Sequence, residues 1–105
     1  NLAGIHGAGA AREAVLKHGA VMREGIGRMG NSYAIPTKDE NIETLPLHRI
    51  APHVAVFIDY AANHPGTEFH LTHIGCGLAG YRWDRDIRPL FPSALPVNIT
   101  ILEPI

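Results

Sequence analysis

The chain has 105 residues, of which 46% are hydrophobic and 18% charged, and its formal net charge is −1. This composition excludes intrinsic disorder, which needs few apolar residues and a high net charge, and it fits a single domain spanning residues 1–105. Nine basic residues are scattered among ten acidic ones, so we expect neither a broad nucleic-acid-binding face nor a membrane partner. A single cysteine, Cys76, excludes an internal disulfide and a cysteine-based zinc cluster. With no secretory or lipidation signal, we expect a cytoplasmic protein.

The amino-terminal half predicts one helix between two glycine-rich stretches, followed by a strand. Residues 1–9 are rich in glycine, and residues 10–18 place apolar side chains on one helical face before Gly19 ends the pattern. Residues 20–30 form the second glycine-rich stretch. Residues 32–37 favour a strand that ends at Pro36, because proline has no N–H to donate to a ladder. The polar residues 38–46 predict a surface loop.

The carboxyl-terminal half alternates helices with strands. A helix is predicted over 47–63, with Pro52 either kinking its first turn or marking its true start, and with apolar residues at helical spacing at Ile50, Val54, Phe57, Ile58 and Ala61. A strand at 68–74, a tight loop at 75–80, a helix at 83–91 and a last strand at 97–102 follow. Strands separated by helices need crossover connections. We therefore expect an α/β fold, with a mainly parallel sheet that helices cover on both faces.

Two glycine-rich segments stand where a bound anion would meet backbone N–H groups. Residues 6–11 open the first predicted helix with small side chains. Residues 74–80 follow a strand and precede a helix, at the strand end where parallel sheets bind ligands. At one sheet edge, the two segments would hold a diphosphate from both sides. The alternative is that the small residues serve only close packing of a helix on the sheet.

A third glycine segment, residues 25–30, matches G-x-G-x-x-G but is not expected to bind a dinucleotide. That motif works when it follows a strand and opens a helix, so that backbone N–H groups meet the pyrophosphate. Here a predicted helix precedes the segment and a predicted strand follows it. We interpret it as a connector.

The seven histidines do not predict a metal site. His70 and His73 are three apart on a predicted strand and point to opposite faces, while His48 and His53 miss the helical spacing of four. His6 and His73 each border a glycine loop, where an imidazole could donate to a phosphate or a ribose.

Tyr81 and Trp83 either stack on a base or pack at the junction of loop and helix.

Three segments together carry a family resemblance. They are residues 7–11, residues 32–38 with the sequence Ser-Tyr-Ala-Ile-Pro-Thr-Lys, and residues 73–80 with the sequence His-Ile-Gly-Cys-Gly-Leu-Ala-Gly, followed by Trp83. They resemble the macrodomain family, especially its branch of terminal ADP-ribose glycohydrolases. Residues 1–9, 32–39 and 72–80 are also similar to a small phage-associated family of unassigned role. The resemblance spans nearly the whole chain and is most specific in residues 74–80.

The resemblance implies a three-layer α/β/α fold that holds ADP-ribose at the ends of its strands. We expect no cofactor and no metal. It implies a first strand before Asn1, and a place in the cytoplasm, that of the host if the chain is phage-encoded. The partner would be an ADP-ribose-type small molecule or an ADP-ribosylated macromolecule. The expected ligand-binding residues are Gly7, Ala8, Gly9, Ala10, Thr37, His73, Gly75, Cys76, Gly77, Leu78, Ala79 and Gly80.

Catalysis in the glycohydrolase branch uses a lysine that attacks the anomeric carbon of the ribose, assisted by an acidic residue of the last loop. Lys38 stands at the position of that lysine, whereas Ala79 replaces the acidic residue. A lysine attacks only as the neutral amine, and Asp39, Asp84 or Asp86 could substitute for the missing carboxylate. The sequence leaves open removal of ADP-ribose from an acceptor, nucleotide binding without turnover, and a protein-interaction module.

Overall fold

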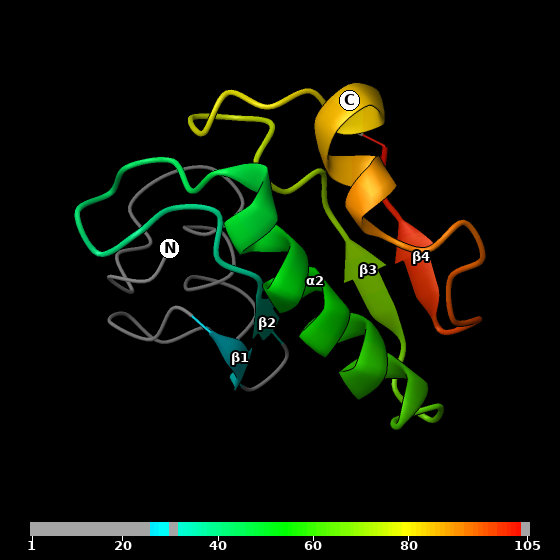
Figure 1. Ribbon diagram of the computed structural model, residues 1–105. Coiled ribbons are helices and arrows are strands. Elements are labelled where there is room, and N and C mark those ends of the chain that lie inside the picture. Colours follow the sequence, from blue (N-terminus) through cyan, green and yellow to red (C-terminus); the bar gives the residue numbers. More distant parts are fainter. Residues whose placement is uncertain (1–25, 30–31, 104–105) are drawn as a thin grey trace. The chain divides into compact units, whose positions relative to one another are not determined.

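The structure is a computed structural model that describes residues 26–29 and 32–103 (Figure 1). By its internal contacts the chain divides into two compact units, one up to Leu45 and one from Pro46 onward. The predicted helix at 10–18 and the glycine loop at 6–11 lie outside the described residues. No helix in the described ranges is long and apolar enough to cross a membrane.

The described part of the first unit contains an antiparallel strand pair. Strand β1 (Gly27–Met29) pairs with β2 (Ser32–Ala34), with Arg28 opposite Tyr33. The segment interpreted as a connector therefore contributes a strand, and strand β2 is shorter than the predicted 32–37. Gly27 has a φ of 85°, a conformation that side chains other than glycine rarely adopt. Glycine-rich sequence has little strand propensity, so cross-strand pairing decides the conformation here.

A polar loop after β2 is organised by one aspartate. The Asp39 carboxylate accepts hydrogen bonds from the N–H groups of Asn41 (2.8 Å) and Glu43 (3.0 Å), and Lys38 forms an isolated bridge with Thr44. Ile42, inside this turn, has a φ of 62°. The loop confirms the surface segment predicted at 38–46, except that Leu45 is buried.

Helix α2 (Leu47–Ala62) begins the second unit and confirms the longest predicted helix. Ile50, Val54, Phe57 and Ala61 are buried, as the apolar spacing predicts, and Pro52 lies inside the helix. The helix begins at Leu47, so Pro52 does not mark its start; as the sixth helical residue, Pro52 lacks the N–H that would otherwise donate to the carbonyl four residues earlier. At its end, Tyr60 stacks on His64 with ring centroids 4.0 Å apart.

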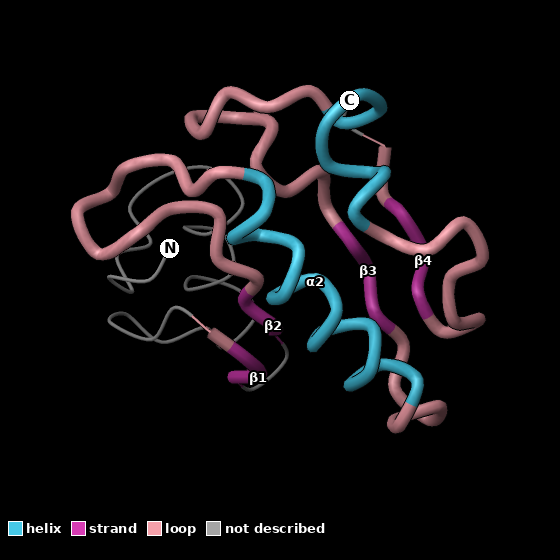
Figure 2. Tube along the Cα trace, viewed as in Figure 1, coloured by secondary structure: helices cyan, strands magenta, loops and turns pink. Residues whose placement is uncertain are grey.

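Two parallel strands lie along α2. Strand β3 (Phe69–Leu71) pairs in parallel with β4 (Ile99–Ile101), with Phe69 opposite Ile99 and Leu71 opposite Ile101. Phe69 meets Phe57 of α2 edge to face, at a centroid distance of 5.4 Å. Figure 2 shows α2 running beside this strand pair. The apolar core of the second unit therefore forms between the helix and one short sheet.

An asparagine joins the strands to the helix end. The Asn98 side-chain amide, just before β4, donates toward three carbonyl oxygens, those of Ala61 (2.9 Å), His64 (3.0 Å) and Thr67 (2.9 Å). These carbonyls belong to the last turn of α2 and to the loop that follows it. Asn98 therefore fixes where both strands start relative to the helix.

The segment after the glycine loop is helical but irregular. It consists of a π-helical turn, η1 (Trp83–Ile87), and a 3₁₀ turn, η2 (Arg88–Leu90), where the sequence predicts one helix over 83–91. Pro89 lacks the N–H that a continuing α-helix would need. Ile87 and Phe91 are buried, whereas Leu90 is half-buried.

These elements confirm an α/β protein, but not the predicted sheet as a whole. Among the described residues the strands form two separate pairs, and only β3–β4 is parallel. The strands predicted at 68–74 and 97–102 are shorter in the structure, with three residues each. The three-layer arrangement of the macrodomain family stays a prediction.

Candidate functional site

A hollow of about 620 Å³ lies where β3 and β4 end. Its walls come from the loop after β3, from η1 and from the residue two positions after β4, and the lining side chains are His73, Cys76, Tyr81, Arg82, Trp83, Asp84, Arg85 and Glu103. Figure 1 shows β3 and β4 pointing the same way, with the η1 turn beyond their ends. We call this site the His73 hollow. It belongs entirely to the second unit.

The loop that follows β3 is closed by backbone hydrogen bonds. The N–H of Tyr81 donates to the carbonyl of Gly75 (2.8 Å), and the N–H of Gly80 donates to that of Gly77 (3.0 Å). Gly75 and Gly80 have φ values of 73° and 87°. These conformations require glycine in practice, which explains two of the three glycines in residues 75–80.

Several N–H groups of this loop have no hydrogen-bond acceptor within the described residues. They belong to Gly75, Gly77 and Leu78, whereas Ala79 does have a partner. Leu78 is 82% exposed, and a side chain added at Gly77 would meet open space. Unpaired N–H groups on an open loop are suited to binding an anion.

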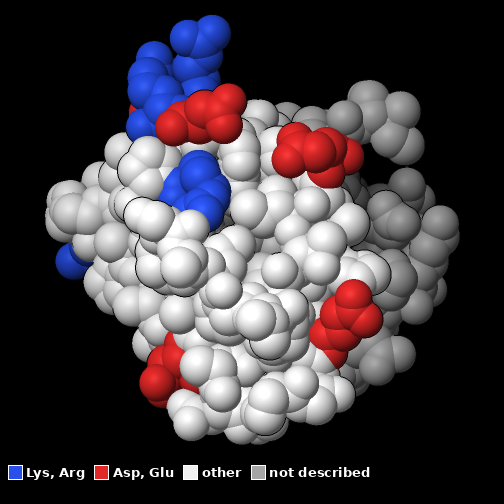
Figure 3. Space-filling model, turned by 90° about the vertical axis from the view of Figure 1, so that its right-hand side faces the viewer, with Lys and Arg blue, Asp and Glu red and all other residues white. Residues whose placement is uncertain are grey.

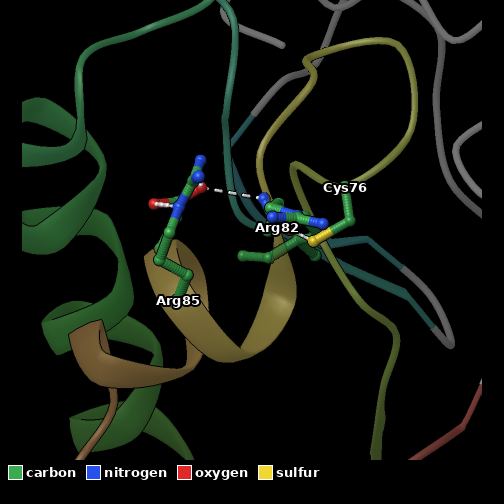
Figure 4. A network of polar contacts seen from close by, with 5 residues as sticks. Cys76, Arg82 and Arg85 are labelled. Atoms are coloured by element: carbon green, nitrogen blue, oxygen red, sulfur yellow. Dashed lines mark hydrogen bonds and ion pairs between the residues drawn. The ribbon is translucent and has the colours of Figure 1, made fainter.

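On the other side of the hollow, one aspartate organises the start of η1. Asp86 accepts two hydrogen bonds from the Arg85 guanidinium (both 2.8 Å) and one from the backbone N–H of Arg82 (2.9 Å) (Figure 4). The hydrogen bonds from Arg85 and Arg82 lower the pKa of Asp86 to about 2. Arg85 is thereby neutralised by its neighbour. The Arg82 guanidinium forms no hydrogen bond or ion pair in the part of the chain that the structure describes.

A stacked pair of rings is part of the lining of the hollow. The imidazole of His73 lies on the indole of Trp83 with centroids 4.2 Å apart and an interplanar angle of 2°, and Trp83 in turn contacts Phe91. The side chain of His73 is 15% exposed, and its Nε2 is buried without a hydrogen-bond partner. A Glu103 carboxylate oxygen lies 3.5 Å from Nε2, close enough for electrostatic attraction but outside hydrogen-bond geometry.

Cys76 lines the hollow as a thiol. Partial burial, with a smaller contribution from the negative charge of Asp86, raises the pKa of Cys76. Its Sγ donates to the carbonyl of Ile74 at 3.4 Å. A nucleophilic cysteine needs the opposite, an electropositive environment that lowers the pKa. This agrees with the sequence, which offers Cys76 no histidine in a suitable local pattern.

The structure places the predicted site residues in three groups. His73 and Cys76 line the hollow, and Gly75 and Gly77–Gly80 form the loop beside it. Thr37 and Lys38 are half-buried in the first unit, and their predicted roles stay predictions. Gly7, Ala8, Gly9 and Ala10 lie outside the described residues, so the predicted convergence of two glycine loops stays a prediction as well.

Sequence reasoning missed three charged residues of the hollow. Arg82 and Arg85 lie two and five residues after the glycine loop, and basic residues after such a loop were a usable signal for an anion site. Glu103 gives no such signal, because it is thirty positions from His73 and comes close to it only through the β3–β4 pairing.

One face of the molecule carries local groups of charge rather than one broad patch. On the face shown in Figure 3, basic and acidic side chains gather together at the top, and a large area below carries few charges. Within the described ranges, no group of three or more histidine, cysteine or acidic residues is arranged to hold a metal ion.

Comparison of the chain with family models, curated proteins and solved structures finds no match.

Proposed function

We propose that the His73 hollow binds the diphosphate of an ADP-ribose-type nucleotide. The observation that carries the proposal is an unpaired guanidinium in the lining of a hollow at the ends of parallel strands, next to a glycine loop whose N–H groups are open and whose residues Cys76 and Tyr81 line the same hollow. The N–H groups are those of Gly75, Gly77 and Leu78, and the guanidinium is that of Arg82. Backbone N–H groups of a loop and an arginine are groups that proteins use to hold diphosphates.

The size and walls of the hollow also agree with a nucleotide. Its volume of about 620 Å³ lies in the range of small-molecule sites. Tyr81 and Trp83 offer aromatic surface in the same lining. The resemblance of residues 73–80 to the macrodomain family supplies the choice of ADP-ribose among diphosphate compounds.

Isothermal titration calorimetry with ADP-ribose tests the proposal, with ADP, AMP and inorganic pyrophosphate as comparison ligands. We expect ADP-ribose to bind more tightly than pyrophosphate, and AMP, which has no diphosphate, to bind least. Arg82→Gln should weaken ADP-ribose binding about tenfold or more, because a charged hydrogen-bond donor is lost.

A matched control is Arg49→Gln, which removes an exposed arginine of α2 away from the hollow. It should leave the affinity unchanged. Absence of any heat or thermal stabilisation at millimolar ADP-ribose would refute the proposed function, since a ligand that binds only the native state must stabilise it.

A further inference from the structure

The register of the β3–β4 pair determines which residues face each other beyond the strand ends. Residues thirty apart are partners throughout the pair, from Phe69 and Ile99 to Leu71 and Ile101, and the N–H of Leu102 extends it by donating to the carbonyl of Leu71 at 2.9 Å. Two positions further, the same offset brings Glu103 to His73. Their proximity is therefore a consequence of the sheet.

The two partners of this contact differ in how firmly they are held. The His73 ring is fixed against Trp83, and its Nε2 is buried without a hydrogen bond. Glu103 is 80% exposed, and its carboxylate forms no hydrogen bond in the described part of the chain. A buried imidazole nitrogen without a partner is costly. The best available partner is an oxygen that approaches more closely than the carboxylate does.

We propose that His73 Nε2 is a donor to the ligand's phosphate, and that the Glu103 carboxylate occupies the place of that phosphate in the ligand-free protein. The proposal rests on the proposed function and adds to it a second cationic group and a competing anion. On binding, a phosphate oxygen takes the position beside Nε2 and the exposed carboxylate turns away into solvent. The imidazole is then protonated, because a closer and more highly charged anion favours its cationic form.

The surroundings of His73 suit this exchange. The indole face of Trp83 favours a cation stacked on it. The other ionisable groups around the hollow are Cys76 and Tyr81 in the loop, Arg82, Asp84 and Arg85 at η1, and Glu103 itself. Histidine is the one side chain among these that ordinarily changes its charge between pH 5 and 8. Binding should therefore take up a proton in that interval, so affinity should fall as the pH rises.

The test measures the dissociation constant of ADP-ribose between pH 5.5 and 8.5 by calorimetry. We expect it to rise ~5- to 10-fold over this interval in the wild type, as one histidine proton is linked to binding. His73→Gln should bind more weakly at low pH and show no pH dependence. Glu103→Gln should bind a few times more tightly, because the competing charge is gone. Its pH dependence should persist, because His73 is still present.

A matched control exists at the other end of β3 (Phe69–Leu71). His70 and Glu68 form an exposed imidazole–carboxylate pair at 3.4 Å, outside the hollow. Glu68→Gln should behave as the wild type. Because Glu103 is exposed, Glu103→Gln stays informative even if His73→Gln fails to fold.

Two outcomes would overturn the inference while leaving the proposed function intact. One is ADP-ribose binding whose pH dependence survives in His73→Gln. The other is weaker binding by Glu103→Gln, which would make Glu103 a ligand contact rather than a competitor. Absence of ADP-ribose binding by the wild type at every pH would instead refute the proposed function and this inference with it.

Discussion

The carboxylate of Asp86 accepts a 2.9 Å hydrogen bond from the backbone N–H of Arg82, four residues earlier in the chain. This contact closes the first turn of η1 and holds Arg82 at the edge of the His73 hollow. Together with the Arg85 guanidinium it lowers the pKa of Asp86 to about 2. An aspartate in an unfolded chain titrates near ~3.9. The ionised carboxylate therefore stabilises the folded state above about pH 4, and this contribution is lost as the pH falls toward about 2.

The first prediction concerns acid stability. In Asp86→Asn, whose amide does not titrate, the melting temperature should fall less between pH 4 and pH 2 than in the wild type, and it should already be lower at pH 7. Scanning calorimetry over this range measures both effects. Asp84→Asn is the control, since this exposed neighbour has the same charge and accepts no hydrogen bond within the described residues. Identical acid profiles for the two variants would contradict the prediction.

The second prediction tests whether the glycine loop binds the ligand, with a variant that blocks the loop without unfolding the protein. A side chain at Gly77 would meet open space, and Gly77 does not have a positive φ. Gly77→Val should therefore fold normally but weaken ADP-ribose binding at least tenfold, because the new side chain stands over the N–H groups. Gly66→Val, at an equally open position outside the hollow, is the control. Equal affinity of the two variants for ADP-ribose in calorimetry would show that the loop takes no part in binding.

The third prediction is that Cys76 reacts slowly. Its raised pKa leaves little thiolate at neutral pH, so alkylation by iodoacetamide at pH 7.5 should be slower than that of glutathione. Asp86→Asn should accelerate the reaction, because it removes a negative charge that disfavours the thiolate. Mass spectrometry of the modified protein over time gives the rates. Reaction as fast as with glutathione would show that Cys76 lies in a different environment.

The fourth prediction concerns the connection between α2 and the sheet. Asn98→Ala removes the amide that donates toward three carbonyls and should cost ~1–3 kcal/mol of unfolding free energy, because partly buried acceptors lose their donor. Urea unfolding measures this cost. Asn63→Ala removes a single exposed hydrogen bond to Asp59 and should cost under ~0.5 kcal/mol. A loss at Asn98 no larger than at Asn63 would contradict the role assigned to Asn98.

The fifth prediction concerns backbone strain in the loop that contains Asp39. Ile42 is a β-branched residue with a φ of 62° and is 41% exposed. Asparagine tolerates this conformation better, so Ile42→Asn should stabilise the protein by about 1 kcal/mol. Thermal unfolding of the variant beside Ile42→Val, which keeps the β-branch, tests the claim. A gain shared by both variants would exclude relief of strain as its cause.

The sequence predicted the elements whose pattern is local. The apolar spacing of Ile50, Val54, Phe57 and Ala61 predicted α2 and its buried face, because helical periodicity repeats within a few residues. The glycines at 75 and 80 predicted a tight loop, and their positive φ values agree with that use. The strands were predicted too long, and the strand at Gly27–Met29 was missed, because its pairing with Ser32–Ala34 cannot be recognised from glycine-rich sequence.

What the sequence determined by itself is therefore the helix, the glycine loop and the mixture of helices and strands, since each depends on neighbouring residues. Only the tertiary structure decided that the β3–β4 register brings Glu103 to His73 and that Trp83 lies under the imidazole. The physical reason is that a site at the ends of parallel strands is assembled by non-local pairing. Such pairing depends on the register between segments, and neither composition nor periodicity encodes that register.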